Sequence, residues 1–200
     1  NKAIRPTILT SHNNRAQAIN QQKLNEIPEQ SKSFKAEYFG DKNKIELLKK
    51  NCIASENLQL KVGAQVMMIK NTYQKEGIIN GSLGIIRGFS AKKSYPVVEF
   101  SNGAKITIKP EEWLIERFDD NKKQLVCEAG VSQIPLIMSW AITIHKSQGL
   151  TLDKISCDLS NIFSPGQAYV ALSRARSLDG IFISSIDFNR IRADQSAVQY

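Results

Sequence analysis

The chain has 200 residues and a net charge of +8, and 42% of its residues are hydrophobic while 23% are charged. This balance excludes an intrinsically disordered chain, and the length allows one large domain or two small ones with a real core. The basic excess favours a polyanionic partner such as nucleic acid, while a merely basic, soluble surface explains the charge about equally well.

Membrane, secreted and metal-binding classes are disfavoured by simple patterns. No apolar run approaches the ~18 residues that a membrane span needs, and no signal peptide opens the chain. Cys52, Cys127 and Cys157 form no CxxC pair, which argues against disulfides and a zinc site. We therefore expect no metal site, no membrane partner and a reducing compartment, either bacterial cytoplasm or a eukaryotic nucleus or mitochondrion. The chain also contains no GxxxxGKS or GxxxxGKT loop that could cradle a nucleoside triphosphate.

The N-terminal stretch "RPTILTSHNNRAQAINQQKL" predicts a short strand, Thr7 to Thr10, followed by a helix that Ser11 or Asn13 can cap. From Asn25 to about Gln59 the signal is weaker. There, "SFKAEYF" alternates like a strand and "DKNKIELLKKN" is typical of a short charged helix.

The middle of the chain is rich in short apolar runs separated by turn residues. Asn80-Gly81 and Asn102-Gly103 are both strong hairpin signals because glycine adopts positive φ readily. Roughly five strands between Lys61 and Ser132 predict a small closed or half-open β-barrel. Such a module fixes no function by itself.

After Gln133 strands and a helix alternate. "IPLIMSWA", "KISCDLS" and "DGIFISSI" read as strands, and "SPGQAYVALSRAR" predicts a helix with Ser164 as its cap and Pro165 at its first position. This alternation is typical of a parallel sheet, which the N-terminal strand and helix also suit. We therefore predict an α/β domain made of residues 1–60 and 133–200, interrupted by an all-β insertion at residues 61–132.

Two segments of the α/β domain could bind phosphate. In the predicted helix, Gln167 and Arg174 lie seven residues apart, hence on one face, and an arginine fork can hold a phosphate oxygen; a solvated surface arginine is the alternative. In "WAITIHKSQGLTLD", His145 has no neighbouring carboxylate and Ser147 lacks a Gly-x-Ser-x-Gly setting, which disfavours covalent catalysis.

That second segment instead offers polar donors and exposed backbone N–H groups at a helix start, which is a natural phosphate-binding edge. For His145 taken singly, a satisfied core histidine remains the alternative. The chain is basic, has two segments that could bind phosphate and contains no phosphate loop. This combination suggests half of a nucleotide-driven motor.

Long stretches of the chain resemble superfamily-one DNA helicases of the Pif/RecD group. "QIPLIMSWAITIHKSQGLTLDKISCDL" and "SPGQAYVALSRARSLDGIFI" resemble the last two helicase motifs of that group, and "ILTSHNNRAQAIN" is similar to its fourth motif. "LKVGAQVMMIKN…GIINGSLGIIRGF…PVVEF" looks like the stretch between them. The resemblance implies the second, RecA-like (P-loop NTPase-type) motor domain of such a helicase, with an SH3-like barrel as its insertion.

The resemblance also implies roles for individual residues. Arg174 matches the arginine finger that reaches the γ-phosphate of ATP across the domain cleft. Gln167 and Gly149 match positions in the nucleotide cleft, and Arg15 is a candidate for a second γ-phosphate contact.

The DNA-binding positions of the family fall on four residues of the other motif, where donors would hold a single-stranded phosphate backbone without reading its sequence. They are Thr143, His145, Lys146 and Ser147.

The expected function is therefore the C-terminal motor half of an ATP-dependent 5′-to-3′ DNA helicase. ATP and Mg²⁺ would be held mainly by an N-terminal motor domain that these 200 residues do not include, so we expect the chain alone to be inactive. Its expected partners are single-stranded DNA, ATP and that domain, and we expect a monomer. A non-enzymatic nucleic-acid-binding module, or the helicase segment of a relaxase or RecD-type complex, are the alternatives.

Overall fold

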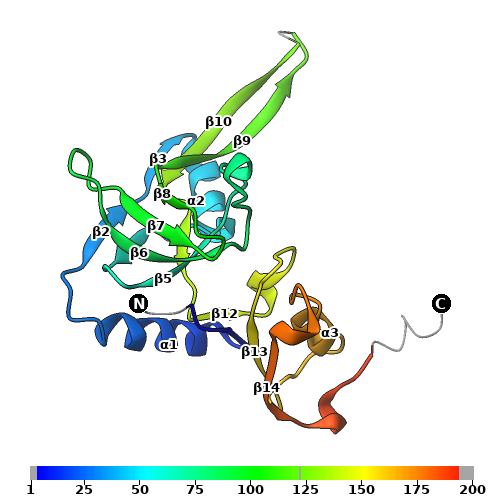
Figure 1. The fold of residues 1–200 in the computed structure, drawn as a ribbon. Helices are drawn as coiled ribbons and strands as arrows, with labels where there is room; N and C mark the ends of the chain where they lie inside the picture. Colours follow the sequence, from blue (N-terminus) through cyan, green and yellow to red (C-terminus); the bar gives the residue numbers. More distant parts are fainter. Residues whose placement is uncertain (1–3, 122, 194–200) are drawn as a thin grey trace.

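The computed structural model describes residues 4–121 and 123–193, which form one parallel and three antiparallel β-sheets. The parallel sheet and the antiparallel sheets occupy different ends of the molecule (Figure 1). None of the helices in the described residues has the length and hydropathy of a membrane-spanning segment.

The parallel sheet has four strands in the order β12-β1-β13-β14, and every neighbouring pair is parallel. The predicted α/β class with a parallel sheet is therefore confirmed. Helix α1 packs against β1 and β12, and α3 packs against β13. The bounds are β1 Thr7–Thr10, α1 Asn13–Asn25, β12 Ala141–Thr143, β13 Ile155–Leu159, α3 Gln167–Leu172 and β14 Ile181–Ile186.

Every second side chain of β13 contributes to the hydrophobic core of this sheet. In β13 every second residue is buried, so that Ile155, Cys157 and Leu159 face inward. They pack with Leu9 from β1 and with apolar residues of α3 in one cluster. The central strands of a parallel sheet are covered by helices, and this accounts for their apolar composition.

The largest antiparallel sheet has five strands in the order β11-β5-β6-β7-β8. The predicted turn at Asn102-Gly103 joins β7 to β8, and Gly81 lies in the connection from β5 to β6, with both glycines at positive φ. The bounds are β5 Gln65–Met68, β6 Leu83–Phe89, β7 Pro96–Phe100, β8 Lys105–Thr107 and β11 Leu136–Met138.

A second antiparallel part surrounds the long hairpin β9–β10, which projects away from the rest of the molecule (Figure 1). Strand β3 pairs with β10, β2 pairs with β4, and Leu48 of α2 packs on Ala129 and Val131. The bounds are β2 Lys32–Lys35, β3 Glu37–Gly40, α2 Lys42–Asn51, β4 Asn57–Leu60, β9 Glu111–Asp119 and β10 Gln124–Gln133.

Strand pairing divides the chain differently from the predicted limits at residues 60 and 133. Within residues 32–60, β2 and β4 pair with each other and β3 pairs with β10, and all of these pairs are antiparallel. Leu58 and Leu60 also belong to the core under the five-stranded sheet. We call residues 28–138 the antiparallel unit, and residues 4–27 together with 139–193 the parallel unit.

Both predicted helix caps differ from the structure. His12 is the N-cap residue of α1 and its side chain makes no capping bond, so neither Ser11 nor Asn13 has that role. Helix α3 begins after Gly166, which has φ +72°, and Ser164 does not cap it with its side chain. The helix ends at Leu172 because the next backbone groups are drawn into pairing with Leu152, which donates to Arg174 O at 2.8 Å.

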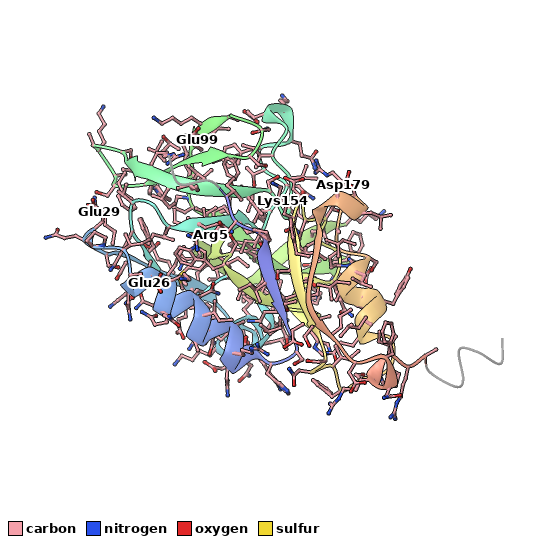
Figure 2. The ribbon with its side chains drawn as sticks, turned by 60° about the horizontal axis from the view of Figure 1, so that its bottom comes forward. Arg5, Glu26, Glu29, Glu99, Lys154 and Asp179 are labelled. Atoms are coloured by element: carbon pink, nitrogen blue, oxygen red, sulfur yellow. The ribbon has the colours of Figure 1, made fainter. Side chains whose placement is uncertain are left out.

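The two edges of the parallel sheet carry different residues. Lys154 and Asp179 precede β13 and β14 and lie together at the amino edge (Figure 2). The carboxyl ends of β12, β1 and β13 lead into the segments that contain His145, His12 and Ser160. Ligands of open parallel sheets bind beyond the carboxyl ends of the strands, so the second edge is where a site is expected.

Gly40 should be the more sensitive of two glycines with positive φ. It has φ +97°, and a Cβ added there would overlap the carbonyl oxygen of Glu128 in the β3–β10 pair. Gly103 has φ +85° with no atom within 4 Å of the added Cβ. We expect Gly40→Ala to lower the free energy of unfolding by about 2 kcal/mol or more, and Gly103→Ala by about 1 kcal/mol. Urea unfolding of both variants tests this, and equal losses would contradict the steric argument.

Candidate functional site

The polar segment after β12 forms a 3₁₀ turn at His145–Ser147. His145 and Lys146 are exposed, whereas Thr143 and Ser147 are buried. The two buried hydroxyl groups hold the turn together. Ser147 Oγ donates to Ile144 O at 2.7 Å, and Thr143 Oγ1 accepts from the backbone N of Lys146 at 3.3 Å.

The expected row of exposed backbone N–H groups at a helix start is not formed. The backbone N–H of Ser147 donates to Ile144 O, and that of Gln148 donates to His145 O, both at 3.2 Å. Because a 3₁₀ turn closes bonds at i→i+3, its donors are used internally. Within the turn, the side chains of His145 and Lys146 are exposed and are therefore the groups available for contact with a phosphate backbone.

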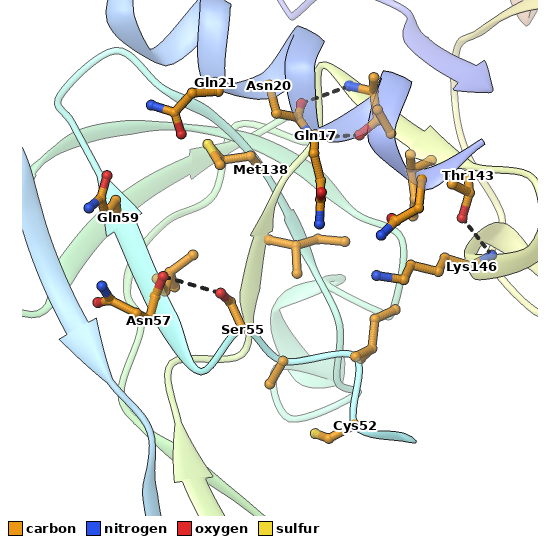
Figure 3. Close-up of a pocket in the computed structure, with 18 residues that line it drawn as sticks. Gln17, Asn20, Gln21, Cys52, Ser55, Asn57, Gln59, Met138, Thr143 and Lys146 are labelled. Atoms are coloured by element: carbon orange, nitrogen blue, oxygen red, sulfur yellow. Dashed lines mark hydrogen bonds between the residues drawn. The ribbon is translucent and has the colours of Figure 1, made fainter. Parts of the chain in front are cut away.

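Lys146 reaches into a pocket of about 510 Å³ between α1 and residues 52–59 (Figure 3). It is the one charged residue among those that line the pocket. The other polar lining groups are mostly amides and hydroxyls, which can donate to phosphate or to base edges. They are Asn13, Gln17, Asn20, Gln21, Ser55, Asn57, Gln59 and Thr143.

Sequence reasoning missed this pocket because its two walls are distant in the chain. Asn57 and Gln59 come from the weakly patterned region before residue 60, and Gln17 comes from α1. The Asn20 amide fixes one wall by pairing with the backbone of Ala141, with bonds of 2.8 and 2.9 Å. No local sequence pattern predicts this pairing, because 121 residues separate the two partners.

Arg174 lies just beyond α3 and its guanidinium is held by protein oxygens. Nε donates to Val170 O at 3.0 Å, and the terminal nitrogens contact Leu150 O at 3.4 Å and Ser173 Oγ at 3.0 Å. The predicted placement of Gln167 and Arg174 on two turns of one helix is wrong, because the helix ends before Arg174. The structure instead joins Arg174 to the segment that follows the 3₁₀ turn.

Arg174 and Arg176, which follow α3, differ in whether a carboxylate neutralises their charge. Arg176 pairs with Asp153 at 3.2 Å, whereas no carboxylate among the described residues contacts the partly buried Arg174. Gly149, next to Leu150, has φ +76° and open space beside its Cα. An oriented arginine without a carboxylate partner is suited to an anionic ligand.

Gln167 is 4% exposed, and only one of the two polar groups of its side-chain amide has hydrogen-bond partners. Its Oε1 accepts the backbone N–H of Phe163 at 2.9 Å and that of Ser164 at 3.3 Å. Its Nε2 has no partner among the described residues. A buried unpaired amide donor is costly, and it is commonly explained by a bound group or by water.

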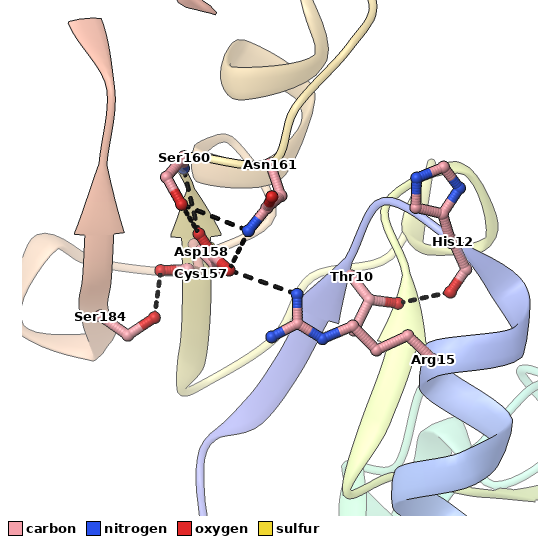
Figure 4. A network of polar contacts seen from close by, with 8 residues as sticks. All are labelled: Thr10, His12, Arg15, Cys157, Asp158, Ser160, Asn161 and Ser184. Atoms are coloured by element: carbon pink, nitrogen blue, oxygen red, sulfur yellow. Dashed lines mark hydrogen bonds and ion pairs between the residues drawn. The ribbon is translucent and has the colours of Figure 1, made fainter.

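Arg15 belongs to a polar network at the carboxyl end of β13 (Figure 4). It contacts Asp158 Oδ2 at 3.3 Å, and the same carboxylate accepts from Ser160 Oγ at 2.6 Å and Asn161 Nδ2 at 2.8 Å. Next to this network the His12 ring stacks on Phe163, with centroids 5.1 Å apart.

The predicted site residues thus fall into separate groups. His145, Lys146 and Gly149 lie on the segment that follows β12, and Arg174, just beyond α3, contacts Leu150 O of the same segment. Arg15 lies in the Asp158 network, and its charge is partly neutralised there.

The cysteines are free thiols in the structure. Burial raises the pKa of Cys157 to about 11, so this thiol is unreactive at neutral pH. Among residues 4–121 and 123–193, no three His, Cys, Asp or Glu side chains form a group that could hold a metal ion.

The Asp158 network should make stability depend on acidity. Hydrogen bonds from Ser160, and then from Asn161 and Arg15, lower the pKa of Asp158 from 3.8 to about 2. A lowered pKa stabilises the fold above pH ~4, and this contribution of about 2 kcal/mol disappears as the pH falls towards 2. We expect Asp158→Asn to be less stable than the parent by about that amount at pH 6, with a smaller difference at pH 3. Urea unfolding at both pH values tests this, and a constant difference would contradict it.

Comparisons with known proteins agree on one family. The sequence profile described as "DNA helicase Pif1, 2B domain" matches residues 45–89, which lie within the antiparallel unit. The ATP-dependent DNA helicase PIF1 of Xenopus laevis is 36% identical over 199 residues, covering 97% of this chain and 30% of the relative.

Two solved structures of Pif1 from Bacteroides match almost the whole chain. The complex with ADP-AlF4 has a TM-score of 0.84 and 30% identity, covering 98% of this chain and 44% of its own. The structure bound to ssDNA has a TM-score of 0.69 and 30% identity, covering 99% and 45%. The chain therefore spans less than half of these solved chains and under a third of the Xenopus relative. The profile, the relatives and the structures thus show that this chain is similar to part of Pif1 helicases.

Proposed function

We propose that this chain is the C-terminal motor half of an ATP-dependent DNA helicase that moves 5′ to 3′ on single-stranded DNA. The parallel unit would be its second RecA-like domain, and residues 61–132, within the antiparallel unit, would be an SH3-like barrel inserted into that domain. The 200 residues contain no phosphate loop. An N-terminal motor domain of the same protein would therefore hold most of the ATP together with Mg²⁺.

The observation that carries this proposal is the setting of Arg174. Its guanidinium is oriented by three oxygen acceptors and contacts no carboxylate of residues 4–121 and 123–193, and it lies beside the Gly149–Leu150 turn. The chain also matches, over 98% of its length, a helicase solved with ADP-AlF4. An arginine presented in this way can stabilise the charge that develops on a transferring phosphoryl group.

Gln167 and Gly149 supply further support for a nucleotide cleft. The unpaired Gln167 Nε2 is a buried donor that a polar ligand or an ordered water would satisfy. Gly149 leaves open space beside the backbone where a ligand can approach closely. Arg15 is the weaker candidate because Asp158 already contacts its guanidinium.

One short segment links the proposed DNA edge to the proposed nucleotide contact. Lys146 lines the pocket beside α1, and four residues later Leu150 O accepts from Arg174. Leu152 then pairs with the backbone of Arg174 and Arg176. A displacement of Arg174 on ATP binding or hydrolysis would therefore be transmitted to Lys146. In this way alternating grip on the strand would follow the ATP cycle.

Arg174→Ala in the full-length gene product should abolish DNA-stimulated ATP hydrolysis, with a rate loss of about 10³-fold or more. Nucleotide binding should change little, because the guanidinium acts mainly in the transition state. Arg176→Ala is the matched control, since Arg176 pairs with Asp153 and should keep near-parent hydrolysis. Parent-like hydrolysis by Arg174→Ala would refute the role proposed for Arg174. No hydrolysis by the full-length parent would contradict the motor function and favour a non-enzymatic binding module.

The chain itself should bind single-stranded DNA through His145 and Lys146. We expect His145→Ala combined with Lys146→Ala to weaken binding and to lower the slope of log K against log salt by about 0.7 per lost phosphate contact. Fluorescence anisotropy with a labelled oligothymidylate at two salt concentrations measures both effects. Lys154→Ala is the control because Lys154 is exposed at the opposite, amino edge of the sheet. An equal effect of both variants would refute the assigned edge.

A further inference from the structure

The antiparallel unit carries a groove of about 960 Å³ that the motor function does not use. Its walls are β2, the loop between β6 and β7, the turn between β8 and β9, and the end of β10. Figure 1 shows β2, β7 and β8 well away from the parallel sheet. The groove is therefore separate from the pocket beside Lys146, with which it shares no lining residue.

Positive charge in this groove is not neutralised by ion pairs. Lys35, Lys93 and Lys109 line it from three different elements, and none of them contacts a carboxylate in the described part of the chain. Glu37 is the one carboxylate in the lining. Lys32, close by, bonds to Ser94 Oγ at 3.0 Å rather than to an acid.

Some lysines elsewhere contact a carboxylate, namely Lys23, Lys44, Lys49 and Lys70, whereas others, such as Lys42 and Lys75, have no such contact in the described part of the chain. The groove gathers three lysines without a carboxylate contact around one cavity, where their charge is free for an external anion. A surface where like charges gather without partners is unfavourable in itself, and an anionic ligand removes that repulsion.

Aromatic rings lie between these lysines. Phe34 and Tyr95 are partly buried, so each packs on the hydrophobic core while also lining the groove. Lys93 Nζ lies 5.9 Å from the centroid of the Tyr95 ring, and the Phe34 ring stacks on Phe89 at 6.2 Å. Rings supported from below in this way offer faces on which flat ligands can stack.

Hydrogen bonds hold the groove walls in place. In the β6–β7 loop, Ser90 N donates to Tyr95 O at 2.8 Å, and Tyr95 N donates to Ser90 Oγ at 3.0 Å. On the other side, the buried Gln133 Nε2 donates to Phe34 O at 2.9 Å and fastens β2 to β10. The Lys109 backbone N donates to Tyr73 Oη at 3.3 Å. The lysine and aromatic side chains are thus mounted on fixed backbone before any ligand arrives.

We propose that this groove binds single-stranded nucleic acid, as a contact additional to the edge at His145 and Lys146. The lysines would neutralise phosphates, and unpaired bases would stack on Tyr95 and Phe34, which is the combination that single-strand grooves use. A duplex could offer only its phosphates, because its bases are stacked on one another. The inference stands on the groove residues alone, so it goes beyond the proposed motor function.

The charge contribution is tested with Lys93→Glu combined with Lys109→Glu in the whole chain. Anisotropy of a fluorescein-labelled oligothymidylate should show about tenfold weaker binding at about 50 mM salt, and a salt slope reduced by about 1.4 for two lost phosphate contacts. Lys42→Glu combined with Lys75→Glu changes the charge equally at exposed sites outside the groove. An equal loss in this control would show a general charge effect and overturn the proposal.

The stacking contribution is tested with Tyr95→Leu, which keeps an apolar side chain on the core. We expect this variant to bind the oligothymidylate roughly fivefold more weakly or worse. The salt slope should be unchanged, because stacking involves no counterion release. A thermal melt checks that the variant is folded, and Tyr38→Leu serves as the control, because Tyr38 is a partly buried tyrosine on another core cluster and does not line the groove. Parent-like affinity of folded Tyr95→Leu, or tighter binding of a blunt duplex than of the single strand, would overturn single-strand stacking.

The variant His145→Ala with Lys146→Ala separates this inference from the proposed function. If it alone weakens binding and the groove variants bind like the parent, the groove proposal fails while the motor edge stands. If only the groove variants weaken binding, the groove stands and the motor edge is misassigned. Both sets are expected to weaken binding, and their combination should reduce it further than either set does.

Discussion

The architecture depends on one buried junction between the parallel and antiparallel units. Gln65 is 3% exposed, and its side chain bonds to the Arg5 backbone N and O at 2.9 and 3.0 Å and to Ser139 O at 3.1 Å. Ser139 lies between β11 and β12, where the chain leaves the antiparallel sheet and enters the parallel one. Leaving any of these bonded groups unpaired would cost about 1–3 kcal/mol, which favours this arrangement of the junction, whereas the buried Ser139 Oγ has no partner among the described residues.

This junction gives the site its geometry. Because β12 starts two residues after Ser139, the polar segment that follows it is fixed relative to both units. Met67 and Leu83 of the antiparallel unit pack in the same cluster as Leu9 and Ile142 of the parallel unit. The pocket beside Lys146 lies between these units, and Arg174 contacts the far end of the same segment. The segment from Lys146 to Leu150 is thus a short connection between this pocket and Arg174.

Much of the fold could be predicted from local patterns. The strand Thr7–Thr10 is predicted to the residue, and the alternation after Gln133 correctly indicates a parallel sheet, except that Leu136–Met138 pairs antiparallel with β5. The prediction also places residues 28–60 in the domain of the parallel sheet, whereas β2, β3 and β4 belong to antiparallel sheets. The apolar runs of these residues are short and would fit a strand of either a parallel or an antiparallel sheet. Their partners lie up to 99 residues away, as with Gln133 and Phe34, and no local pattern reports such pairing.

The sequence by itself determined which residue types could bind phosphate, because the motifs around His145 and Arg174 carry donors at recognisable spacing. Only the tertiary structure decided which of those donors are free. Ser147 is buried and bonded to Ile144, Arg15 is paired with Asp158, and Arg174 has no carboxylate partner among the described residues. It also brought lysines and rings from three separate segments into one groove. The reason is physical: hydrogen bonding and charge neutralisation depend on distances in space, which chain spacing does not specify.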